Sequence, residues 1–123
     1  MIRGLVGKEN RPLIPLVVGW NRGVQEIPAM VDTGFSGELK IPSRMIDELG
    51  LKITHAQPVL LADGTNMTMR ASLAFVTMEG ITHEVNALIS NGPPVVGGTL
   101  LKRFGYKLIV DYKTNIVELE RSD

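Results

Sequence analysis

One segment near the middle of the chain alternates between apolar and small or polar side chains with a period of two. The apolar positions are Met67, Met69, Ala71, Leu73 and Phe75. This period places successive side chains on opposite faces of an extended strand, whereas a helix repeats about every 3.6 residues. Just before the segment, Ala62, Asp63, Gly64 and Thr65 lie between apolar residues, and Asp-Gly in such a setting is a strong hairpin signal. The chain is therefore predicted to build its fold around a β-hairpin.

The other apolar segments are short and are separated by Gly, Asn, Asp and Pro, which is typical of β-rich chains. Strands are expected at residues 13–19, 25–31, 38–41, 59–61, 67–75, 81–89, 95–96, 106–112 and 115–120. Two short helices are expected to begin at the N-caps Ser43 and Thr99 and to end at Gly50 and Gly105. A chain of 123 residues with this inventory predicts one mostly β domain, 1–123, folded as a closed β-barrel with two short helices.

The predicted elements repeat weakly within the chain. A strand, a turn with Gly, a further apolar segment and a short helix ending in Gly occur at residues 27–50 and again at 85–105. The echo lies in the order of elements rather than in residue identity, so it favours two structurally related halves.

Composition excludes several classes of function. Thirteen basic residues balance thirteen acidic ones, so the chain lacks the positive charge that binding a nucleic-acid backbone requires. Without cysteine there are no disulfides or thiolate nucleophiles. Lys8, Glu9 and Asn10 interrupt the start of the chain before an apolar signal region develops, and the longest apolar run, 13–20, is too short to span a bilayer. We expect a cytoplasmic protein with no membrane or nucleic-acid partner.

The triplet Asp32-Thr33-Gly34 directly follows an apolar strand end. A plain turn is one interpretation, because Asp often starts turns and Gly tolerates positive φ. The preceding Ala29-Met30-Val31 favours another interpretation, in which the strand carries the carboxylate toward an apolar interior. Burial there disfavours the charged form, which is a property of working carboxyl groups. Both interpretations remain open on the triplet alone.

Three segments together resemble the retropepsin-like aspartic proteases. Residues 29–37, with the sequence AMVDTGFSG, are similar to the active-site loop of that family. Residues 95–101, VVGGTLL, match its second motif, in which two aliphatic residues, a Gly, two variable positions and Leu open a short helix. The hairpin at 61–64 falls between them, where the family carries its flap. The resemblance covers about residues 13–112 and implies an acid-protease barrel.

The resemblance implies an endopeptidase that is active as a homodimer and acts on a peptide or protein substrate. Each chain would supply one catalytic carboxylate, Asp32, and two such groups in contact would share a proton; the aspartic-protease pair is itself the standard example of this effect. The other residues implied are the loop supports Thr33, Gly34 and Ser36, the cleft or flap residues Phe35, Ala62, Asp63 and Gly64, and the second-motif residues Val96, Gly97 and Leu100. No metal and no cofactor is needed.

The sequence also departs from the family. Phe35 stands where retropepsins commonly have Ala, so its ring is expected either to narrow the cleft or to form a specificity pocket. The flap tip has no tyrosine. A non-catalytic dimeric β-barrel of the same fold, binding peptides or a protein partner, is therefore the alternative function. An unrelated barrel with a coincidental turn is a third. His55 and His83 lack an evident third metal ligand and are interpreted as surface residues.

Overall fold

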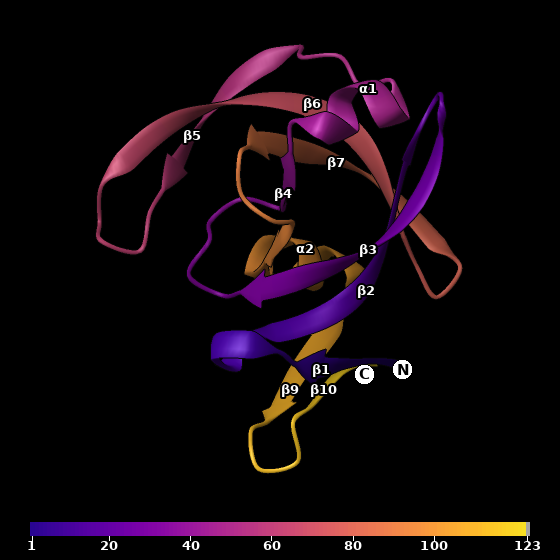
Figure 1. Cartoon of the computed structure of the whole chain (residues 1–123), viewed down its shortest axis with the longest axis vertical. Coiled ribbons are helices and arrows are strands. Elements are labelled where there is room, and N and C mark those ends of the chain that lie inside the picture. The colour runs from indigo at the N-terminus through magenta and orange to yellow at the C-terminus, as the bar shows by residue number, and fades with distance from the viewer. Residues whose placement is uncertain (123) are drawn as a thin grey trace.

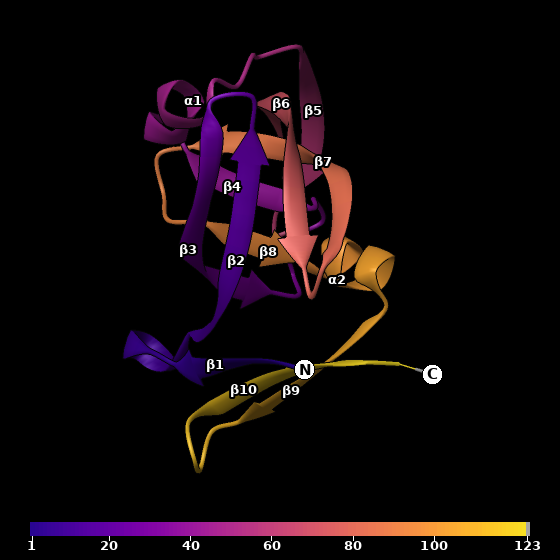
Figure 2. The same cartoon turned by 90° about the vertical axis from the view of Figure 1, so that its right-hand side faces the viewer.

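The structure is a computed structural model that describes residues 1–122 (Figures 1 and 2). Its strands are β1 Ile2–Val6, β2 Pro12–Trp20, β3 Gly23–Asp32, β4 Leu39–Pro42, β5 His55–Leu60, β6 Asn66–Met78, β7 Ile81–Ser90, β8 Val95–Gly97, β9 Tyr106–Asp111 and β10 Ile116–Arg121. The helices are α1 Arg44–Leu49 and α2 Gly98–Phe104, with a 3₁₀ turn at Lys8–Asn10. The mostly β fold with two short helices is confirmed.

Six strands close into a barrel. Their order around the ring is β6, β7, β4, β8, β3 and β2, and β2 pairs again with β6 through Val17 with Thr77 and Gly19 with Phe75. The predicted closed barrel is therefore confirmed. Strands β1, β10 and β9 continue the sheet beyond β2 and lie as a separate layer under the barrel, beside the N-terminus (Figure 2). At the other end of the sheet, β5 pairs only with β6 and forms a hairpin that extends away from the barrel (Figure 1).

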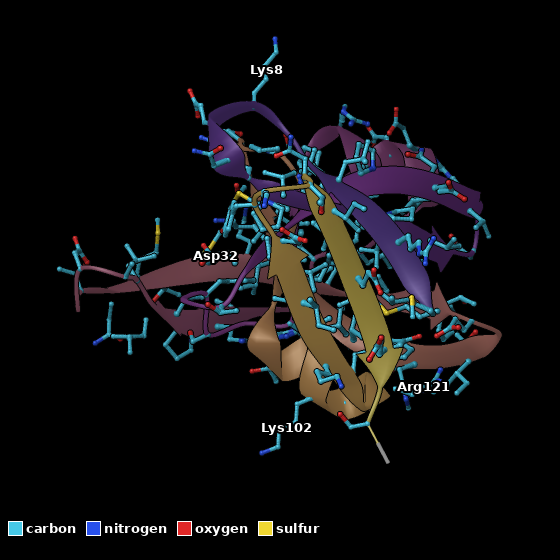
Figure 3. The ribbon with its side chains drawn as sticks, turned by 90° about the horizontal axis from the view of Figure 1, so that it is seen from below. Lys8, Asp32, Lys102 and Arg121 are labelled. Carbon is cyan, nitrogen blue, oxygen red and sulfur yellow. The ribbon has the colours of Figure 1, made fainter. Side chains whose placement is uncertain are left out.

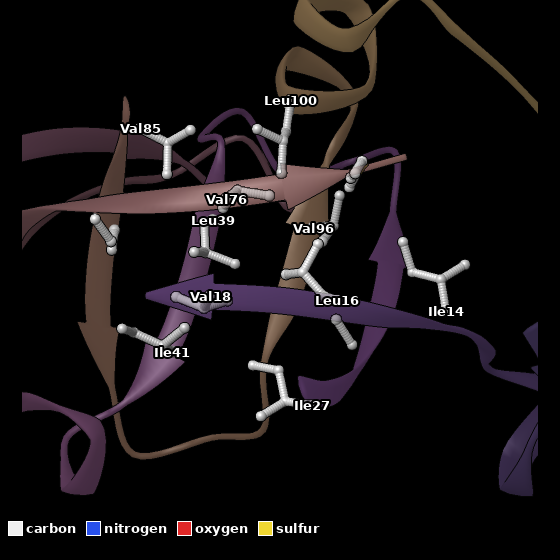
Figure 4. Close-up of a cluster of buried hydrophobic side chains, with 14 of the residues drawn as sticks. Ile14, Leu16, Val18, Ile27, Leu39, Ile41, Val76, Val85, Val96 and Leu100 are labelled. Carbon is white, nitrogen blue, oxygen red and sulfur yellow. The ribbon is translucent and has the colours of Figure 1, made fainter. Parts of the chain in front are cut away.

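Aliphatic side chains from every strand of the barrel fill its interior (Figure 4). Among those completely or almost completely buried are Leu16, Val18, Leu39, Ile41, Val76, Val85, Val96 and Leu100. Burying one such side chain contributes about 1.5–3 kcal/mol relative to exposure, so this core is the main source of stability. A second, smaller cluster lies apart from it and comprises Phe35, Val59, Met69, Ala71, Leu88 and Val95.

Strand β6 buries different faces along its length. Met69 and Ala71 are buried in the second cluster, whereas Ala74, Val76 and Met78 are buried in the barrel core. The predicted period of two is present, but the single apolar face predicted for residues 67–75 is wrong. Phe75 is 42% exposed, because the strand passes from one cluster to the other and exchanges its buried face near Ser72.

Both helices end at the predicted glycines but lack the predicted side-chain caps at their starts. Gly50 and Gly105 take the left-handed conformation, with φ of 73° and 77°, and end α1 and α2 as predicted. The predicted side-chain caps are wrong, since neither helix has a side-chain hydrogen bond at its N-cap. The hydroxyl of Thr99 instead donates to the carbonyl of Ser36, 3.3 Å away, because α2 starts at Gly98 and its N-cap is Gly97, two residues before the predicted cap. Strand β1 and the first residues of β5 were not predicted.

The two halves of the repeat lie side by side in the wall of the barrel. Strands β3 and β8 pair in parallel, β4 and β7 pair in parallel, and β4 and β8 are antiparallel between them. Each half then runs into its helix, α1 after β4 and α2 after β8. The echo predicted from residues 27–50 and 85–105 is therefore a structural repeat. It places the end of β3, with Asp32, beside the end of β8, with Gly97.

Candidate active site

Asp32 is the last residue of β3, and strand alternation decides where its side chain lies. Val31 points into the barrel core, so Met30 and Asp32 share the opposite face of the sheet. The interpretation that Asp32 itself enters the apolar interior is therefore wrong for the single chain. Asp32 is half-buried and paired with Gly97 of β8, on the outer face that also carries the second cluster. The carboxylate is thus accessible from outside the barrel.

The loop after Asp32 turns back on the aspartate. The backbone amide of Gly34 donates to the Asp32 carboxylate over 2.9 Å, and the amide of Phe35 donates to the Asp32 carbonyl over 3.1 Å. The Gly34 bond fixes the carboxylate against its own loop, since a charged acceptor makes a backbone amide bond stronger, and the Phe35 bond closes the turn. Thr33 and Gly34 are themselves exposed on the outside of the loop.

Gly97 packs directly against this loop. A Cβ atom at Gly97 would lie 2.1 Å from the carbonyl oxygen of Gly37 and 2.8 Å from that of Phe35, which is closer than real Cβ contacts. The amide of Gly97 also donates to the carbonyl of Glu38 over 3.0 Å. Only glycine therefore allows the second motif and the active-site loop to touch. The neighbouring motif residues Val96 and Leu100 point the other way and are fully buried in the core, where they anchor β8 and α2.

The ring of Phe35 is buried, with 7% of its surface exposed. We call the β5–β6 hairpin the flap hairpin. The Phe35 ring packs in the second cluster with Val59 and Met69 of this hairpin and with Leu88 of the barrel wall. Space for the ring is left by Gly37, where a Cβ atom would lie 2.5 Å from the ring carbon Cζ. Phe35 therefore fills the floor beneath the flap hairpin.

The tip of the flap hairpin is a tight turn. The amide of Leu61 donates to the carbonyl of Thr65 over 2.8 Å, and Gly64 has a φ of 87°, which favours glycine. Ala62, Asp63 and Gly64 are all exposed there. Both the hydroxyl and the backbone amide of Thr65 donate hydrogen bonds to the Asp63 carboxylate. These bonds, the hydroxyl bond most of all, hold the pKa of Asp63 below its usual range. At neutral pH the flap tip carries this negative charge.

Ser36 connects the active-site loop to its neighbours. Its hydroxyl accepts a hydrogen bond from the amide of Leu60, near the flap tip, over 3.1 Å. Its carbonyl accepts the Thr99 hydroxyl bond from the second motif. The three segments recognised separately in the sequence are thus joined at one residue. Ser36 holds one strand of the flap hairpin against the loop that carries Asp32.

Sequence reasoning missed an ion pair behind the loop. Glu38 is 9% exposed, and its carboxylate accepts a hydrogen bond from Arg103 of α2 at 2.5 Å and another from the amide of Asn86 at 3.2 Å. Arg103 also donates to the carbonyl of Glu84 over 3.0 Å. The pair connects the loop, α2 and β7. No local pattern marks it, because its partners are 65 positions apart.

A hollow of about 420 Å³ opens beside Asp32 and is bounded on one side by β9. Figure 3 shows Asp32 near the β9–β10 hairpin. It is lined by Pro12, Met30, Val31, Asp32, Thr33, Leu108, Val110 and Tyr112. Apart from Asp32 and Thr33 the lining is apolar or aromatic. The aspartate therefore lies at the edge of an uncovered apolar surface.

Other site types lack support in the described part of the chain. Within residues 1–122, no three His, Asp or Glu side chains gather where they could hold a metal ion. His83 packs edge to face on Phe104, with ring centroids 4.6 Å apart, and His55 shares a hydrogen bond with Thr54. Neither α1 nor α2, the helices of residues 1–122, has the length and apolar content of a membrane-crossing helix.

Comparison with known proteins places these features in context. The sequence matches the family described as Aspartyl protease over residues 16–101. No curated protein matches the chain in sequence. The fold is similar to EIAV protease in complex with an inhibitor, with a TM-score of 0.59, 16% identity, and coverage of 85% of this chain and 97% of that one. It is also similar to a retropepsin-like aspartic protease from Rickettsia conorii, with a TM-score of 0.60, 18% identity, and coverage of 99% and 90%.

Proposed function

Because this chain belongs to the aspartyl protease family and has a retropepsin-like fold, we propose that it is an aspartic endopeptidase that works as a homodimer. One observation carries the proposal. Asp32 stands on the open face of the sheet, its carboxylate held by the Gly34 amide, at the loop that Ser36 joins to the flap hairpin. One catalytic aspartate per chain requires a second copy to complete the site.

The proposed chemistry uses two Asp32 carboxyl groups in contact. Like charges so close disfavour double ionisation, so the pair holds one proton and titrates as a unit. The ionised member takes a proton from a water molecule, whose oxygen attacks the carbonyl carbon of the peptide bond. The protonated member donates its proton to the carbonyl oxygen. Collapse of the tetrahedral species then breaks the carbon–nitrogen bond, and the leaving amine takes up a proton.

The substrate is proposed to bind as an extended strand between the flap hairpin and the outer face of the sheet. Main-chain hydrogen bonds would hold its backbone and pockets would select its side chains, as in other cases of strand addition. The buried ring of Phe35 forms the floor there rather than an obstruction at the surface. In this proposal Thr33, exposed beside Asp32, faces the second copy, and Asp63 and Gly64 lie over the substrate.

The β9 side of the hollow is the surface proposed to meet the second copy. In the sheet formed by residues 1–122, β9 is the last strand, so its outer edge is unpaired. Such an edge is a template for another strand. Ile109 and Tyr112 are 40% and 58% exposed there, and Tyr112 lines the hollow next to Asp32 and Thr33. A partner covering this surface would bring its own Asp32 to the same place.

Tyr112→Lys is expected to weaken self-association by about tenfold or more, because charging an aromatic side chain within a buried interface removes an anchor. Sedimentation and specific activity measured over a concentration series check this, and activity should recover at high protein concentration. The matched control is Val24→Lys, at a 69% exposed position on the far end of β3 from Asp32. If Tyr112→Lys associates as the parent does, the interface lies elsewhere.

The function itself is tested with a mixture of peptides of varied sequence, digested by the parent from mildly acidic to neutral pH and analysed by mass spectrometry. We expect cleavage inside peptides, without added metal, and inhibition by a pepstatin-type compound. A folded dimer that cuts no peptide at any pH would contradict the proposal and would favour the alternative, a non-catalytic peptide-binding barrel.

A further inference from the structure

A row of paired residues crosses the outer face of the sheet from the active site to the flap hairpin. Met30 pairs with Val95, Val95 with Lys40, Lys40 with Leu88, and Leu88 with Ala71 of the flap strand β6. Directly paired residues point to the same side of a sheet. The row is otherwise apolar, and its other four members belong to the second cluster or pack against it. Lys40 is the single charge in it.

The row also fixes how far Lys40 lies from the site. Its backbone is two strands away from β3, and neighbouring strands are about 4.8 Å apart, so the separation is about 10 Å. An extended peptide advances about 3.3 Å per residue, so about three residues span this distance. A substrate held beside Asp32 under the flap hairpin therefore brings one of its nearby side chains to Lys40.

Lys40 is held in place without an ion pair. It is half-buried, and its ammonium lies 5.3 Å from the centroid of the Phe35 ring, a cation–π contact that orients the side chain. Among residues 1–122, neither Lys40 nor Arg70 of the flap strand makes a salt bridge, although other Arg and Lys residues do. Lys40 on this face, and Arg70 beside Ala71 on the flap strand, are thus left with their charge unmatched by the protein.

Both cations line one cavity. It has a volume of about 440 Å³ and is bounded by Lys40, Leu61, Met67, Thr68, Met69, Arg70, Ile89, Ser90 and Asn91. No carboxylate contributes to this lining. Asp63, the one acidic residue of the flap hairpin, accepts hydrogen bonds from Thr65 instead. The cavity therefore combines an apolar wall for a side-chain stem with positive charge and amide or hydroxyl groups for its end.

We propose that this cavity is a specificity subsite that binds an acidic side chain of the peptide substrate, within about three residues of the bond that is cut. The inference rests on the proposed protease function and adds its substrate class. Glutamate fits best, because its two methylene groups can lie along Leu61 and Met69 while its carboxylate reaches Lys40 and Arg70. Phe35 acts here as a positioning residue through the ring that lies under Lys40.

The probe is a mixture of synthetic peptides of random sequence, and the readout is the ratio of Glu to Gln at each position around the cut bond. The parent is expected to prefer Glu at one position by about five- to tenfold, which is typical of a partly desolvated charge pair. Lys40→Glu should abolish or invert this preference while still cutting peptides with a neutral residue there. The matched control is Lys52→Glu, which makes the same charge change at an exposed residue outside the cavity.

The outcomes separate this inference from the proposed function. Cleavage with no preference for acidic residues, or a preference that survives Lys40→Glu, would overturn the subsite and leave the protease intact. A parent protein that cuts no peptide would contradict the proposed protease function. The subsite is then tested by measuring peptide binding instead of cleavage. The same peptides are passed over immobilised Asp32→Asn protein and over Asp32→Asn with Lys40→Glu. Acidic peptides retained on the first and not on the second support the subsite, and any other pattern overturns it.

Discussion

Asp32→Asn is expected to reduce peptide cleavage by at least about 10³-fold, to the limit of detection. An amide at this position can neither take a proton from water nor share one with a second Asp32, so both roles of the carboxyl pair are lost. The fold should persist, because asparagine keeps the side-chain oxygen to which the Gly34 amide donates over 2.9 Å. Cleavage is measured on the peptide mixture, and the melting temperature is measured in parallel and should stay within a few degrees of the parent.

The matched control for this change is Asp47→Asn, which alters an exposed aspartate on α1, remote in the fold from the end of β3. It should leave the cleavage rate unchanged. A folded Asp32→Asn protein that cleaves as fast as the parent would show that another group performs the reaction.

The second large effect is expected at Gly97. Gly97→Ala places a methyl group 2.1 Å from the carbonyl oxygen of Gly37, which is rigid backbone rather than a flexible side chain. The loop and β8 must separate, which also strains the bond from the Gly97 amide to Glu38. We expect a loss of at least about 3 kcal/mol in unfolding free energy, at the upper end of overpacking, because the clash is with backbone. Cleavage should fall with it, since the loop positions Asp32.

The adjacent residue provides the control. A Cβ atom at Gly98 would meet nothing within 4 Å, and Gly98 is the first residue of α2. Gly98→Ala should therefore be neutral or stabilising by about 0.5 kcal/mol. Urea denaturation of both variants gives the comparison. Equal stabilities for the two would mean that the contact between the second motif and the active-site loop is unimportant.

The strands were predictable because their signals are local. Alternating residues and Asp-Gly or Gly turns mark most of the strands and the ends of both helices, since backbone preferences act over a few residues. Alternation alone did not show which face of a strand is buried. Met69 and Val76 lie on opposite faces of β6 yet are both buried, because the strand serves two clusters. That distinction depends on neighbours far away in the sequence.

The site was predictable in its parts but not in its contacts. Asp32, the flap turn and Gly97 were identified from motifs, whereas the direction of Asp32 was misjudged, because Val31 takes the inward position. The hydroxyl of Thr99 reaches Ser36 rather than capping α2. The Glu38–Arg103 pair exists only because the barrel brings α2 against the loop. Such contacts follow from the closed fold and have no local signature.

The most direct test of the central claim, that two copies of Asp32 form one site, is a mixing measurement. Equal amounts of parent and Asp32→Asn protein are allowed to exchange subunits, and the cleavage rate is compared with that of the same total amount of parent. With random pairing, about a quarter of the dimers keep two Asp32 carboxylates, so we predict a rate about one quarter of that of the parent. A rate of about one half, in proportion to the parent chains present, would show that each chain works alone and would contradict the shared site.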